Sequence, residues 1–114
     1  MDEPLRKALA DQAKVGETIS YGDLAQRLGL KPPQTIHRLT QALERLMEED
    51  AAAGRPLLAA LCTSKTRPGL PAPGFFVKAQ ALGIFAGDPA GPDADAYHAD
   101  ELRRAVLFYR DGLS

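Results

Sequence analysis

Residues 15–30 read VGETISYGDLAQRLGL, and the fold predicted for the chain starts from this stretch. Ser20 is a good helix N-cap, and Asp23 three residues later gives a variant of the capping box. Gly29 suits the left-handed position that ends a helix. A short helix is therefore predicted over residues 21–28. Its apolar residues share one buried face: Leu24, Ala25 and Leu28.

A helix is predicted on each side of this stretch. The first covers about residues 3–14, with Pro4 in its first turn and Gly16 at its end. The other begins near Gln34, after Leu30-Lys31-Pro32-Pro33, and runs to about Ala52. Its predicted core-facing stripe consists of Ile36, Leu39, Leu43, Leu46 and Met47. The residues expected on its opposite, outward side are Gln34, Arg38, Gln41 and Arg45.

The second half of the chain has weaker patterns. The apolar residues 56–65 predict one buried strand, and 66–74, rich in Pro and Gly, predict a loop. Residues 75–85 are interpreted as a strand that turns into a helix. An acidic, flexible linker is expected over 86–95. The apolar spacing that follows predicts a C-terminal helix over 96–111.

Three helices followed by a strand, a loop and an extended return is the order of a winged helix-turn-helix domain. The predicted fold class is therefore α+β, mainly α, with a short β-wing and an added C-terminal helix. Residues 1–114 are expected to form a single domain. The same order of elements occurs in domains that bind protein, so the fold does not by itself fix the function.

The charge distribution is more informative than the net charge of −1. Residues 51–87 contain no Asp or Glu, and the acids gather at Glu44–Asp50 and from Asp88 onward. The basic residues in the acid-free stretch are Arg55, Lys65, Arg67 and Lys78. A locally basic segment on a nearly neutral protein indicates a surface that faces a polyanion.

The composition excludes several classes of protein. With one cysteine, Cys62, the chain has no internal disulfide and no multi-cysteine zinc site, which favours a reducing, cytoplasmic setting. The polar, charged first residues do not resemble a signal or transit peptide. No apolar run approaches the roughly 20 residues needed to span a bilayer. We therefore expect a soluble protein that does not associate with membranes.

The run GETISYGDLAQRLG at 16–29 resembles the segment that opens the DNA-binding domain of alkylguanine DNA alkyltransferases and alkyltransferase-like proteins. In that family, Gly-x-x-x-Ser/Thr-Tyr-Gly-Asp/Glu-Leu-Ala precedes the helix-turn-helix. The residues that fit are Gly16, Ser20, Tyr21, Gly22, Asp23, Leu24 and Ala25. Pattern and order extend the resemblance over residues 15–80, through the Ala42-Leu43 pair, Pro56 and the apolar residues 57–61.

The family's active site, Pro-Cys-His-Arg, is missing. The corresponding residues are Leu61-Cys62-Thr63-Ser64, which lack the activating His and the Arg. A thiol without a base stays mostly protonated and is a poor nucleophile. A buried, inert Cys62 is the alternative to a nucleophile. We therefore expect no alkyl transfer and no enzymatic activity.

The resemblance implies roles for two further residues. Tyr21 matches a family tyrosine near the phosphate of a flipped nucleotide, and Arg38 lies near the family's intercalating arginine, beside His37. The plainer alternatives are a half-buried Tyr21 ring that packs on the first helix, a solvated Arg38 and a surface His37.

No spacing in the chain predicts a metal or cofactor. His98 lies beside Asp100 and Glu101, but the spacing resembles no ligand motif. The acids of the predicted linker region are explained by solvation and by helix N-capping: Asp93, Asp95, Asp100 and Glu101. The glycines follow no phosphate-binding pattern.

Two functions from different classes remain. In the first, the chain is a non-catalytic protein that binds double-stranded DNA, with its third helix in a groove and its wing on the phosphates. The residues predicted to contact DNA are Ser20, Tyr21, Lys31, Gln34, Thr35, His37, Arg38, Gln41, Lys65 and Arg67. In the second, the scaffold binds protein: the Pro-rich residues 67–73 with Phe75-Phe76 form a docking surface, or Leu107, Phe108 and Tyr109 form a homodimer seam.

Overall fold

The computed structural model describes residues 2–65 and 69–111. In chain order, the elements are α1 (Asp2–Val15), β1 (Ile19–Ser20), α2 (Tyr21–Arg27), α3 (Thr35–Ala53), the 3₁₀ helix η1 (Leu58–Leu61), β2 (Cys62–Thr63), α4 (Pro73–Ala81) and α5 (Pro92–Arg110). The predicted α+β, mainly α class is confirmed. The two strands form a small parallel sheet in which Ile19 pairs with Cys62 and Ser20 with Thr63.

The helices predicted in the first half of the chain are confirmed. The Ser20 side chain accepts a hydrogen bond from the Asp23 N–H at 3.2 Å and caps α2. Gly29 has φ of +71° just beyond the C-cap, and Gly54 has the same φ at the C-cap of α3. These are the conformations that glycine adopts at low cost.

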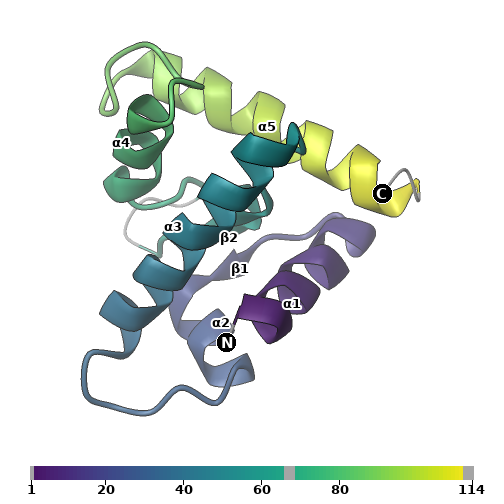
Figure 1. The fold of residues 1–114 in the computed structure, drawn as a ribbon, viewed down its shortest axis with the longest axis vertical. Coiled ribbons are helices and arrows are strands. Elements are labelled where there is room, and N and C mark those ends of the chain that lie inside the picture. The colour runs from purple at the N-terminus through teal and green to yellow at the C-terminus, as the bar shows by residue number, and fades with distance from the viewer. Residues whose placement is uncertain (1, 66–68, 112–114) are drawn as a thin grey trace.

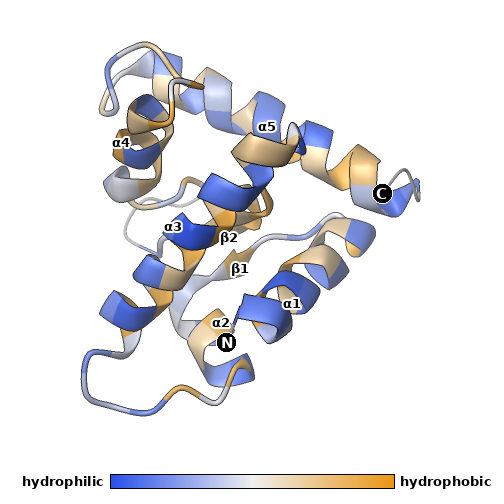
Figure 2. Cartoon of the chain, viewed as in Figure 1, coloured by the Kyte–Doolittle hydropathy of each residue, from blue (hydrophilic) through white to orange (hydrophobic). Residues whose placement is uncertain are grey.

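The core lies between α3, η1 and the surrounding helices. Helix α3 crosses the molecule diagonally, with α1 on one side and α4 on the other, while α5 covers the end opposite α2 (Figure 1). Hydrophobic residues concentrate along β2 and on the inner sides of the helices (Figure 2). Within α3, four of the five residues of the predicted stripe are buried, namely Leu39, Leu43, Leu46 and Met47. The prediction is wrong for Ile36, which is 47% exposed because the first turn of α3 lies at the edge of the molecule (Figure 1).

Three predictions for the second half are wrong. Residues 56–65 form a 3₁₀ turn and a two-residue strand rather than one strand, because a segment buried on all sides has no periodicity that distinguishes the two. Residues 75–85 contain no strand, since α4 begins at Pro73, a residue well suited to a first helical turn. Helix α5 begins at Pro92, so it includes residues 92–95 of the predicted linker.

The predicted wing is not among the described elements. Its loop includes residues 66–68, which lie outside the described part of the chain. Ser64 and Leu70 lie on either side of this gap. The Ser64 N–H donates a hydrogen bond to the Leu70 carbonyl at 2.7 Å, which closes the loop. No helix in the described ranges has the length and apolar character needed to cross a membrane.

Candidate nucleic-acid interface

The first two turns of α3, with the N-cap, lie at one end of the molecule (Figure 1) and carry half of the ten predicted contact residues. The exposed ones are Gln34, His37, Arg38 and Gln41, whereas Thr35 is half-buried. Gln34 is the N-cap and makes no side-chain capping hydrogen bond, and the first turn contains no acidic residue. The free N–H groups and the positive end of the helix dipole are therefore not neutralised by a local carboxylate.

Arg38 connects this turn to the segment before it. Its guanidinium donates a hydrogen bond to the backbone carbonyl of Lys31. A shallow hollow of about 530 Å³ lies between Arg38 and residues 29–34, with the exposed Lys31 at its rim. The Arg38 side chain is thus held against the connection between α2 and α3, and its remaining N–H groups keep their capacity to donate.

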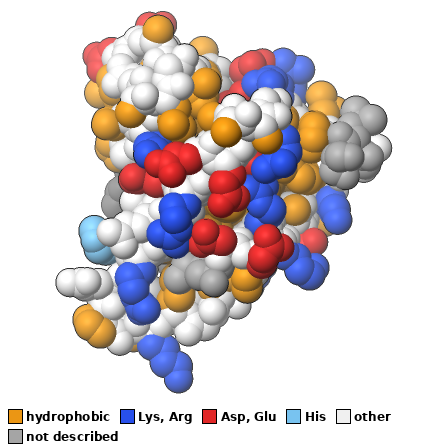
Figure 3. All heavy atoms as spheres, viewed as in Figure 1, with side chains coloured by type: hydrophobic (Ala, Val, Ile, Leu, Met, Phe, Trp, Pro, Cys, Tyr) orange, Lys and Arg blue, Asp and Glu red, His pale blue; other side chains and the backbone are white. Residues whose placement is uncertain are grey.

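The second half of α3 carries the acids Glu44, Glu48, Glu49 and Asp50 and is called its acidic half. Two cations near it are neutralised by ion pairs. Arg45 pairs with Asp2 at 3.1 Å, and Lys78 pairs with Glu48 at 2.6 Å. Across the middle of the face in Figure 3, basic and acidic side chains alternate, whereas its lower end shows Lys and Arg without Asp or Glu. On this face, the cations at the end where α3 begins are therefore not accompanied by carboxylates.

The predicted contact cations that the structure describes differ from these paired ones. Within the described residues, Lys31, Arg38 and Lys65 make no ion pair. A sequence signal for this surface was missed: residues 24–43 contain Arg27, Lys31 and Arg38 but no Asp or Glu. This second acid-free stretch coincides with α2, the connection and the first half of α3.

Lys65 lies in the loop that follows β2. Because β2 pairs with β1, this loop begins next to the start of α2. A second link fixes its far end, since the Tyr21 hydroxyl accepts a hydrogen bond from the Ala72 N–H at 2.9 Å. The exposed Lys65 is therefore carried by a loop anchored at both ends to the β1–α2 junction. The other predicted wing cation, Arg67, lies outside the described residues.

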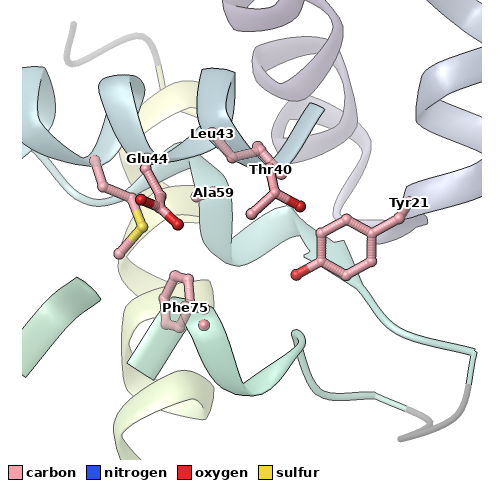
Figure 4. A pocket seen from close by; sticks show the side chains of 8 residues that line it. Tyr21, Thr40, Leu43, Glu44, Ala59 and Phe75 are labelled. Atoms are coloured by element: carbon pink, nitrogen blue, oxygen red, sulfur yellow. The ribbon is translucent and has the colours of Figure 1, made fainter. Parts of the chain in front are cut away.

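Tyr21 is a half-buried ring with an occupied hydroxyl, as its plainer interpretation expects for burial, and it lies beside residues of α3 and α4. Figure 4 shows it pointing between these helices, towards Phe75 and Thr40. Burial raises the pKa of Tyr21 to about 12. The cavity beside it has about 20 Å³ of free volume, which is room for one water molecule and not for a nucleobase.

Cys62 is fully buried in β2. Burial raises the pKa of its thiol well above the ordinary value, so the reactive thiolate is strongly disfavoured. The side chain therefore has the properties of a small core residue, which is the alternative that the missing His and Arg favoured.

Buried polar side chains hold η1, and sequence reasoning missed them. The fully buried Asp50 accepts hydrogen bonds from Arg6, from Arg55 and from the Leu58 N–H. Glu101 accepts from the Leu57 N–H at 2.8 Å, and His98 contacts the Ala60 carbonyl at 2.9 Å. Solvation was the wrong explanation for Glu101, because the turn at 57–60 needs a partner for its N–H groups. Glu101 follows His98 by three residues, so the two side chains share one face of α5. This spacing was the signal in the sequence that could have indicated burial.

Among residues 2–65 and 69–111, no group of His, Cys, Asp and Glu side chains has the arrangement of a metal site. Comparison of the chain with protein-family models, with curated proteins and with solved structures found no match.

Proposed function

We propose that this chain is a non-catalytic protein that binds double-stranded DNA. The first half of α3 enters a groove, and the loop after β2 contacts the phosphate backbone, as in the winged helix-turn-helix of alkyltransferase-like proteins. Gln34, Arg38 and Gln41 supply polar groups for base edges. Lys31 and Lys65 supply charge for phosphates.

The observation that carries the proposal is the contrast between paired and unpaired cations. Arg45, on the second half of α3, is neutralised by Asp2, whereas Arg38, on its first turn, has no carboxylate partner among the described residues. A cation that keeps its charge uncompensated on the surface attracts phosphate most strongly. The helix end that bears Arg38 is also without acids in its first turn.

The test is a fluorescence anisotropy titration of a short labelled duplex, repeated between about 50 and 200 mM salt. We expect binding at low salt that weakens as salt rises, because phosphate contacts release counterions. Absence of binding at low salt, or binding that salt does not change, rules out the proposal.

Two variants and a matched control locate the interface. Arg38→Ala and Lys65→Ala each weaken binding, and Lys65→Ala also lowers the magnitude of the salt slope by roughly 0.9 if one phosphate contact is lost. Arg45→Ala is the control, since it removes the same charge from the same helix at an exposed but paired position. Equal losses for Arg45→Ala and Arg38→Ala mean that net charge alone is responsible and contradict the assigned interface.

A homodimer through α5 is the second candidate. Leu107 is 38% exposed near the end of α5, and its neighbours Phe108 and Tyr109 are half-buried. The other predicted docking surface is not supported, because Phe75 and Phe76 are buried in the core. Sedimentation equilibrium tests the dimer: concentration-dependent mass that Leu107→Asp abolishes supports it, and a monomer at all concentrations contradicts it.

A further inference from the structure

Helix α5 runs along one margin of the molecule and has one side that the rest of the fold does not cover (Figure 1). Its buried residues, on the inner side, are Ala94, His98, Glu101 and Ala105. The opposite side carries a line of exposed residues, called the outer stripe: Asp93, Ala96, Asp100, Arg103, Leu107 and Arg110. At about 100° per residue, these six side chains fall within an arc of about 100°.

The spacing of the outer stripe is that of a seam between two helices. Its members follow one another at alternating steps of three and four residues without interruption. This is the spacing that keeps side chains along the line where two helices pack on each other. The stripe is mostly charged, however, so its apolar content alone does not say what covers it.

The order of the charges does say so, because the stripe is complementary to its own reverse. Counted inwards from the two ends, the matched pairs are Asp93 with Arg110, Ala96 with Leu107 and Asp100 with Arg103. Each pair joins an acid to a base or a small side chain to a large one. When two copies of a helix lie antiparallel about a two-fold axis, each residue faces its counterpart in the reversed order. Two copies of α5 therefore match at every position of the stripe.

The same charges disfavour other occupants. In a parallel pair of helices each residue faces its own copy, so Asp100 would meet Asp100 and Arg103 would meet Arg103, and like charges repel. A polyanion such as DNA is disfavoured by the exposed Asp93 and Asp100. A second copy in the antiparallel orientation is the occupant that satisfies acids and bases together.

The charges at the two ends of the stripe lack partners in the part of the chain that the structure describes. Asp93 and Arg110 form no ion pair there. In the antiparallel arrangement, Asp93 of one copy meets Arg110 of the other. Asp100 and Arg103 already pair within α5 at 2.5 Å and remain exposed. Around the two-fold axis, these two residues of both copies form a network of four alternating charges.

We infer that two copies of this chain form a dimer in which the outer stripes of α5 pack antiparallel about a two-fold axis. The inference rests on the second candidate above, a homodimer through α5, and is independent of DNA binding. It places the seam differently: Leu107 remains in it, whereas Phe108 and Tyr109 are half-buried and lie beside Arg6. Because exposed ion pairs contribute little and are screened by salt, the dimer is weak and salt-sensitive.

Sedimentation equilibrium between about 10 μM and 1 mM protein at low salt tests the inference. For the unaltered protein, we expect a mass that rises with concentration towards that of a dimer, and a dissociation constant that rises with salt. Asp100→Arg places an arginine opposite Arg103 of the other copy on both sides of the axis. We expect this variant to dimerise roughly tenfold more weakly.

A charge exchange and a matched control make the test specific. Asp100→Arg combined with Arg103→Asp restores dimerisation, because the exchanged charges still match in the antiparallel order. In a parallel pair the exchange would leave like charges facing each other. Asp95→Arg makes the same change of charge at an exposed position of α5 outside the outer stripe, and it leaves the dissociation constant unchanged. Circular dichroism checks that the variants are folded.

The outcomes separate this inference from the earlier proposals. A monomer at every concentration overturns the inference and the dimer candidate together, while the proposed DNA binding stands. A dimer that Asp100→Arg does not weaken, or that Asp95→Arg weakens equally, overturns the inference and leaves a dimer through another surface. A weakened dimer that the charge exchange does not restore contradicts the antiparallel order and also overturns the inference.

Discussion

The hydroxyl of Tyr21 and the backbone N–H of Ala72 lie 2.9 Å apart and join the first residue of α2 to the residue before α4. The two are 51 positions apart in the chain. This hydrogen bond gives the partly buried Ala72 N–H its partner and anchors the loop that carries Lys65. Tyr21 therefore positions the candidate interface, whether or not its ring meets DNA.

Replacing Tyr21 with Phe removes this acceptor. We expect Tyr21→Phe to lower the free energy of unfolding by about 1–2 kcal/mol, because the Ala72 N–H is left without its partner. Amide hydrogen exchange at Ala72 should accelerate. Tyr97→Phe is the control, since the half-buried Tyr97 hydroxyl makes no hydrogen bond with the described residues. Equal losses in the two variants, or unchanged exchange at Ala72, would contradict the anchoring role.

The helix ends in the first half of the chain illustrate what the sequence can predict. Ser20, Gly29 and Gly54 act through local chemistry, by capping or by a left-handed backbone, and the helices they limit were predicted correctly. The apolar residues 56–65 gave no such local signal. Their conformation depends on partners that lie far away in the chain.

The candidate interface shows the same division. The exposure of Gln34, Arg38 and Gln41 follows from helical periodicity and is confirmed. Ile36 violates it because periodicity describes direction around a helix and not whether another element covers that turn. Which cations are neutralised also depends on tertiary contacts, such as Arg45 with Asp2, that pattern alone does not reveal.

Asp50 links three parts of the fold, and its loss is predicted to be costly. Its carboxylate binds Arg6 of α1 at 2.9 Å, Arg55 at 3.1 Å and the Leu58 N–H at 3.1 Å. Asp50→Asn keeps the shape but removes the charge, and we expect a loss of about 2–4 kcal/mol in urea unfolding. Glu49→Gln is the control, because Glu49 also pairs with Arg6 but is exposed, where such pairs contribute little. A loss below that of Glu49→Gln would show that the buried charge is not needed.

Cys62 should be protected from alkylation in the folded protein. At neutral pH, iodoacetamide is expected to label it far more slowly than it labels the unfolded chain in urea, because the thiol is buried and its pKa is raised. Mass spectrometry over time measures both rates. Labelling of the folded protein at the unfolded rate would show an accessible thiolate and reopen the question of an enzymatic role.

His98 gives the fold a predictable response to acid. Its Nε2 lies 2.9 Å from the Ala60 carbonyl, which requires a proton on that nitrogen. Burial lowers the pKa of His98 from its ordinary 6.5, and the Ala60 carbonyl and Asp95 only partly oppose this. The unfolded chain therefore takes up the proton first as pH falls. The stabilisation from a neutral His98 is complete above about pH 6.5 and is lost progressively below it.

His98→Gln tests this response because the Gln amide keeps a donor for the Ala60 carbonyl but does not titrate. We expect the free energy of unfolding of the variant to fall less steeply between pH 6.5 and 5 than that of the unaltered protein, with carboxylates causing the slope that remains. NMR titration of the His98 ring in the unaltered protein should give a midpoint below 6.5. Parallel stability curves for the two proteins, together with a midpoint at or above 6.5, would mean that the ring is charged in the fold and that burial does not control its protonation.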